Sequence, residues 1–132
     1  MAIIIRLLVM LLLPLLTSNM AMADDASKAP VDIDLSGQWK GDYGPVTLQQ
    51  DGLSITGSYE EGTAARPKPG TITSGTFNLA TRILVITTYQ DWNKMKGSAT
   101  FTLSQDGTRL NGTTTESGPD GSFSGRWDLW RN

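Results

Sequence analysis

The segment VTLQQDG, residues 46–52, recurs 55 positions later as FTLSQDG, residues 101–107. In both copies apolar and polar side chains alternate before Gln-Asp-Gly, and the match continues after the turn through Ile55 and Leu110. Asp-Gly between two alternating runs indicates a β-hairpin, because Gly supplies the positive φ that a tight turn requires. Each copy therefore predicts a strand, a tight turn and a second strand.

A second repeat links the two ends of the predicted sheet: LSGQW at residues 35–39 matches FSGRW at residues 123–127. Similar first and last strands suit a sheet that closes on itself. Hairpin connections between short strands favour an all-β, eight-stranded antiparallel up-and-down β-barrel over a sandwich. The turn signals place its strands near residues 35–40, 45–50, 53–59, 70–79, 83–90, 97–104, 108–115 and 122–130.

Alternation of apolar and polar residues predicts one buried and one solvated face for this sheet. Ile72 and Phe77 differ in parity, so we expect a β-bulge at Ser74-Gly75 in the fourth strand. Trp127 and Trp130 also differ in parity, so with Trp127 in the core we expect the Trp130 side chain on the outer face of the sheet. The predicted core face contains Leu35, Trp39, Val46, Leu48, Leu53, Ile55, Tyr59, Ile83, Val85, Phe101, Leu103, Leu110, Phe123, Trp127 and Leu129.

Composition excludes several classes of function. The 132 residues contain no Cys and no His, which excludes disulfides, thiolate or imidazole metal sites and His-dependent nucleophiles. A formal charge of −2 without a basic block disfavours nucleic-acid binding. Asp51, Asp106 and Asp120 each precede Gly as turn formers, and no carboxylate is expected where burial would raise its pKa. We expect no catalytic residue, no metal site and no cofactor.

The first 23 residues are typical of a signal peptide. Arg6 precedes the apolar run 7–16, and Ala-Met-Ala at residues 21–23 is a small-x-small cleavage site. A retained anchor would need roughly 20 apolar residues, and this run is shorter. We therefore expect a periplasmic or secreted protein without a membrane span after cleavage. The chain divides into a signal peptide (1–23), a disordered leader (24–34) and a β-barrel domain (35–132).

Connections in an up-and-down barrel alternate between its two ends, so their lengths predict which end is open. Those after strands two, four and six are short, whereas the other four, at residues 42–43, 60–69, 91–96 and 116–120, are longer. Loops on a rigid scaffold and barrel mouths commonly hold ligands. The predicted binding residues at this mouth are Tyr43, Arg66, Lys68, Tyr89, Trp92 and Lys94.

Two features of the predicted mouth have alternative interpretations. Arg66-Pro67-Lys68-Pro69 is a stiff loop that can present two cations to an anion or a partner, or an extended surface loop with solvated charges. Trp92 is either a binding residue, as Trp often is at interfaces, or a lid folded over the core.

The segments LSGQW (35–39), VTL (46–48) and ITGSYE (55–60) resemble the opening of avidin-like and, more loosely, lipocalin-like barrels, the calycin group. The resemblance implies an eight-stranded antiparallel barrel that holds a small ligand in its open end. It also implies that Tyr59 matches the ligand-contacting tyrosine of the avidin biotin site. The chain departs from that pattern at Gly41, where the family has Asn, and near Pro45, where it has Ser.

Three functions are compatible with these features. The first is a non-catalytic protein that binds a small molecule or glycan at the barrel mouth. The second is a periplasmic inhibitor or immunity-type protein that binds a cell-envelope enzyme through the mouth loops. The third, an enzyme, lacks a visible nucleophile or base. A hollow apolar interior would favour the first, and a filled barrel with prominent loops would favour the second.

Export should yield a protein that begins at Asp24, because charge, apolar run and cleavage site occur in the required order. N-terminal sequencing of protein recovered from the periplasm checks this. Recovery of a chain that retains Met1 in the membrane fraction would contradict it.

Overall fold

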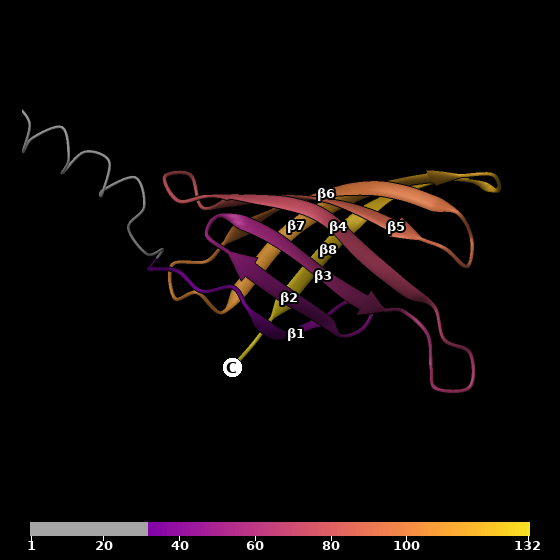
Figure 1. Ribbon diagram of the computed structural model, residues 1–132, viewed down its shortest axis with the longest axis horizontal. Coiled ribbons are helices and arrows are strands. Elements are labelled where there is room, and N and C mark those ends of the chain that lie inside the picture. Colours follow the sequence, from indigo (N-terminus) through magenta and orange to yellow (C-terminus); the bar gives the residue numbers. More distant parts are fainter. Residues whose placement is uncertain (1–31) are drawn as a thin grey trace, which may run out of the picture. The chain divides into compact units, whose positions relative to one another are not determined.

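The computed structural model describes residues 32–132, which form one closed barrel of eight antiparallel strands (Figure 1). The predicted fold class is confirmed. The proposed signal peptide and residues 24–31 of the leader lie outside the described residues. Among residues 32–132 no helix is long and apolar enough to cross a bilayer. The strands are β1 (Gly37–Gly41), β2 (Val46–Asp51), β3 (Ser54–Glu60), β4 (Pro69–Asn78), β5 (Ile83–Gln90), β6 (Met95–Leu103), β7 (Arg109–Gly118) and β8 (Gly121–Trp130).

Each strand pairs with its neighbours in sequence, and β1 pairs with β8 to close the sheet. Both Asp-Gly turns form as predicted: Gly52 and Gly107 have φ angles of 61° and 75°, in the region that favours Gly. The β1–β8 ladder has only the two register pairs Lys40↔Trp130 and Gly41↔Leu129. Other contacts must therefore help to hold this seam.

One end of the barrel is filled by Trp39 and the groups around it. Trp39 is 1% exposed, and its Nε1 donates to the Leu35 carbonyl at 2.9 Å. The Arg131 guanidinium lies over the Trp39 ring, 4.3 Å from its centroid, and also donates to the carbonyls of Asp34 and Gly107. Ile33, from the expected leader, packs against the same core. These contacts join the start of β1 to the end of β8.

The predicted bulge in β4 is present and sits about one residue earlier than expected. The β4–β5 register shifts between Ile72 and Ser74, which leaves Thr73 out of the ladder. The extra residue resets the alternation, so both Ile72 and Phe77 are buried.

The predicted facing of β5 is wrong. Leu84 and Ile86 are buried, whereas Val85 is 48% exposed and Ile83 is only partly buried. Ile83–Ile86 is uniformly apolar, so alternation could not assign its phase. Pairing decides it: Leu84 lies between Phe77 of β4 and Phe101 of β6, and both are buried.

Two further residues predicted in the core are exposed. Leu53 lies in the β2–β3 turn and is 39% exposed. Phe123 has the same parity as buried Trp127, but it lies beyond the packed part of β8 and is 43% exposed. Phe123 instead contacts Tyr43 edge-on, with ring centroids 6.1 Å apart.

The predicted contrast in connection length holds only for the β3–β4 loop, residues 61–68. The β7–β8 turn is reduced to residues 119–120, because both strands extend further than expected. At the filled end, residues 79–82 and 104–108 make connections as long as those at residues 42–45 and 91–94. Figure 1 shows the β3–β4, β5–β6 and β7–β8 connections together at one end of the barrel, on the right. Side-chain packing, not loop length, distinguishes the two ends.

Replacing Trp39 or Trp127 by Ala should each lower the free energy of unfolding by about 3–5 kcal/mol, since both rings are buried in the core. Trp92→Ala is the matched control. Because Trp92 is 45% exposed, its replacement should lower the free energy of unfolding much less. Chemical denaturation measures all three. Losses below about 1 kcal/mol at both core positions would contradict the packed barrel.

Candidate ligand-binding site

A cavity of about 290 Å³ opens at the end of the barrel opposite Trp39. Its wall comes from the β1–β2 and β5–β6 connections, the start of the β3–β4 loop, and the ends of β5, β6, β7 and β8. The barrel is therefore filled at one end and hollow at the other. The lining residues are Tyr43, Glu61, Gln90, Trp92, Asn93, Met95, Thr114, Glu116, Phe123 and Trp127.

Trp127 separates the cavity from the core. It is 2% exposed and packs edge-on against Tyr59 and Phe101, with ring centroids 5.2 and 5.4 Å away. Its Nε1 has no hydrogen-bond partner, and it is the only buried side-chain nitrogen or oxygen in residues 32–132 with that property. Tyr43 meets the same indole from the rim, at 6.4 Å.

A chain of amide hydrogen bonds ties the core to the rim. Gln90, only 2% exposed, donates from Nε2 to the Tyr59 hydroxyl at 3.2 Å and accepts from Asn93 Nδ2 at 2.8 Å. Asn93 in turn accepts from the backbone N–H of Met95. Burial raises the pKa of the Tyr59 hydroxyl from its ordinary value of 10.0 to about 12.

The β3–β4 loop is held by its own hydrogen bonds. Glu60 Oε1 accepts from the backbone N–H groups of Gly62 and Lys68, and Thr63 and Arg66 exchange two backbone hydrogen bonds of 3.1 Å. Lys68 Nζ lies 5.4 Å from the centroid of the Trp92 ring. This loop is thereby connected to the cavity rim through Trp92.

Two carboxyl groups face the cavity and have raised pKa values. Glu61 as a whole is exposed, but its carboxyl is partly enclosed by the cavity wall; burial raises its pKa, and repulsion from Glu116 raises it further. Burial also raises the pKa of Glu116. The expectation that no carboxylate has a pKa raised by burial is therefore wrong. Both residues continue rows of core side chains toward the mouth, where burial is incomplete.

Known proteins resemble this barrel in structure but not in sequence. No family model and no curated protein matches the chain. Among solved structures, rhizavidin in its biotin complex matches with a TM-score of 0.51 and 18% sequence identity, over 74% of this chain and 91% of that chain. The fold is avidin-like. The predicted resemblance to calycin-type barrels is thus confirmed at the level of the fold.

The avidin-like barrel brings together only some of the predicted binding residues. Tyr43 and Trp92 line the cavity. Lys68 does not line it, but its ammonium group lies over the Trp92 ring. Tyr59 is 4% exposed and lies below the cavity, one hydrogen bond away through Gln90.

The other three predicted residues lie elsewhere. Arg66 is exposed on the β3–β4 loop and is not part of the cavity lining. Lys94 forms an exposed ion pair with Asp91 at 2.6 Å, and the Tyr89 hydroxyl donates to the same carboxylate. Tyr89 is displaced because β5 has the opposite phase from the one predicted, which points Gln90 inward and Tyr89 outward.

Most residues that sequence reasoning missed follow one rule. Glu61, Gln90, Met95, Glu116 and Phe123 share the inward parity of core residues further down β3, β5, β6, β7 and β8. Each inward row is apolar near Trp39 and becomes polar or aromatic near the mouth. Extending the inward rows of β3, β6, β7 and β8 to the mouth would have found four of these residues, whereas Gln90 was concealed by the wrong phase of β5.

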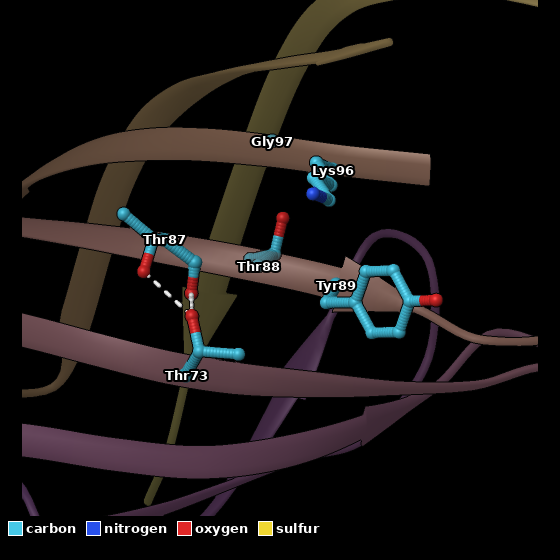
Figure 2. A pocket seen from close by; sticks show the side chains of 6 residues that line it. All are labelled: Thr73, Thr87, Thr88, Tyr89, Lys96 and Gly97. Atoms are coloured by element: carbon cyan, nitrogen blue, oxygen red, sulfur yellow. Dashed lines mark hydrogen bonds between the residues drawn. The ribbon is translucent and has the colours of Figure 1, made fainter. Parts of the chain in front are cut away.

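A second, larger depression of about 580 Å³ lies on the outer wall over β4, β5 and β6. Figure 2 shows Thr73 and Thr87 joined by hydrogen bonds, with Tyr89 and Lys96 beside them. It is shallow and open, and the Thr73 and Thr87 hydroxyls are hydrogen-bonded to each other. Its volume therefore reflects open solvent between outward side chains, and we assign the site to the mouth cavity.

Glu116→Gln should raise the thermal midpoint of the avidin-like barrel at pH 7. A carboxyl whose pKa is raised on folding contributes its stability below the unfolded-state pKa, and that contribution is lost as pH rises through the folded value. At pH 7 the ionised group therefore opposes folding, and Gln removes this effect.

Differential scanning calorimetry at pH 7 and at pH 4 measures the effect, which should shrink at the lower pH. Asp51→Asn is the control, because Asp51 is exposed at the opposite end of the barrel. A midpoint at pH 7 lowered by Glu116→Gln would contradict the prediction.

Proposed function

We propose that this chain is a non-catalytic binding protein that holds a small molecule in the mouth cavity. The observation that carries the proposal is the cavity itself: four aromatic side chains and a few polar groups converge on about 290 Å³ above a packed core. Concave, largely apolar sites with few polar groups are the usual form of small-molecule sites. The proposed place of action is the periplasm or the cell exterior, and it depends on the predicted signal peptide.

Biotin is not the ligand we expect, although rhizavidin was crystallised with it. Tyr59, which matches the ligand-contacting tyrosine of the avidin pattern, is buried under Trp127 and bonded to Gln90. Glu61 and Glu116 would also repel the carboxylate of biotin. Titration with biotin is therefore a useful negative control.

A protein partner is the second candidate, because three exposed aromatic residues surround the same opening. Tyr43, Trp92 and Phe123 are 37%, 45% and 43% exposed. Aromatic residues of this kind often dominate protein interfaces. If a cell-envelope protein binds here, Trp92→Ala should weaken its capture by roughly 2 kcal/mol or more.

Ligands from a fragment screen should depend on the cavity wall. Trp92→Ala and Phe123→Ala should each weaken a hit about tenfold, because each removes an aromatic surface that the ligand would contact. Ligand-observed NMR identifies the hits, and calorimetry measures their affinities.

Leu79→Ala is the matched control, since Leu79 is an equally exposed apolar residue in the β4–β5 turn at the other end of the barrel. It should bind every hit as the unmodified protein does. Hits that are lost with Leu79→Ala but retained with Trp92→Ala would contradict the proposal, because they would place the site at the end of the barrel opposite the cavity.

A further inference from the structure

The mouth cavity is surrounded by more negative than positive charge. Glu61 and Glu116 line it and repel each other. At the rim, Asp42, Glu61, Glu116 and Asp128 all raise the pKa of the Tyr43 hydroxyl, after the larger effect of its burial. A cationic group in the cavity would relieve the repulsion between the two lining carboxylates, whereas an anionic group would add to it.

The positive groups at this end lie outside the cavity lining, and three of them contact other side chains. Arg126 pairs with Asp128 at 3.2 Å, and Lys94 pairs with Asp91. Lys68, which lowers the pKa of Glu61, lies over Trp92 but does not line the cavity. Within residues 32–132 the cavity lining itself contains two carboxylates and no Lys or Arg.

Aromatic rings make up much of the remaining wall. Tyr43, Trp92, Phe123 and Trp127 all line the cavity. The faces of such rings attract ammonium groups, most strongly for Trp and when water is displaced. The position of Lys68 over Trp92 shows that an ammonium group is accommodated against this ring. The aromatic rings and the carboxylates of the wall therefore both favour a cationic ligand.

We propose that the mouth cavity binds a small organic ammonium ion that carries an apolar or aromatic body. Its ammonium group lies near Glu61 and Glu116, and its body packs against Trp92 and Phe123. This inference rests on the proposed small-molecule function. A bare metal cation fits less well, because two carboxylates among aromatic rings supply too few oxygen ligands.

Three probes on one frame test the charge preference by isothermal titration calorimetry. They are para-methoxyphenethylamine, the corresponding alcohol, and the corresponding propionate, which are cationic, neutral and anionic at pH 7. The amine should bind at least about tenfold more tightly than the alcohol, and the propionate should bind weakest.

Two charge-removing variants assign the effect to the cavity. Glu61→Gln and Glu116→Gln should each weaken the amine several-fold while leaving the alcohol unchanged, and each should make the affinity of the amine less dependent on salt concentration. Asp51→Asn, at the opposite end, should change neither probe. The thermal midpoint of each variant establishes that it is folded.

The outcomes separate this inference from the function on which it rests. Equal binding of all three probes, abolished by Trp92→Ala, would overturn the cation preference and support a neutral small-molecule site. Tightest binding of the propionate would overturn it as well. Failure of every probe to bind at millimolar concentration would overturn the ammonium proposal, while hits from the fragment screen would still support the cavity as a site.

Discussion

Closure of the barrel depends on one narrow seam. β1 and β8 share only two register pairs, so the sheet closes where its backbone ladder is shortest. Side chains reinforce the seam on both sides of that ladder: Trp39 is covered by Arg131, and Asp42 accepts from the backbone N–H of Asp128 at 3.0 Å. An unclosed sheet would expose both edge strands and the whole inner face. The core and the cavity both exist because this seam holds.

The candidate site follows from the same strands that make the core. Inward rows that are apolar around Trp39 continue to the mouth, where their members become Glu, Gln, Met or Phe. Trp127 marks the boundary, since it contacts Phe101 below and Tyr43 above. The packed core and the candidate site are therefore separated along the barrel axis, and Trp127 is shared between them. Glu61 and Glu116 belong to the site and oppose folding when ionised, because the folded state raises their pKa values.

The fold could be predicted from the sequence because internal repeats and turn residues mark its strands and hairpins. Two Asp-Gly hairpins and matching first and last strands specified eight strands, and the parity break between Ile72 and Phe77 specified the bulge. The site was harder to predict because the phase of β5 is invisible in its uniformly apolar run. Only pairing of Leu84 with Phe77 and Phe101 fixes that phase. With the observed phase, Gln90 lines the cavity and Tyr89 lies outside its lining.

The contact between Arg131 and Asp34 places both ends of the folded domain beside Trp39, on the far side of the barrel from the cavity. A linker, surface attachment or fused protein joined at either end would thus leave the mouth pointing away from the support. The geometry makes the domain suited to display on a solid phase or a larger assembly.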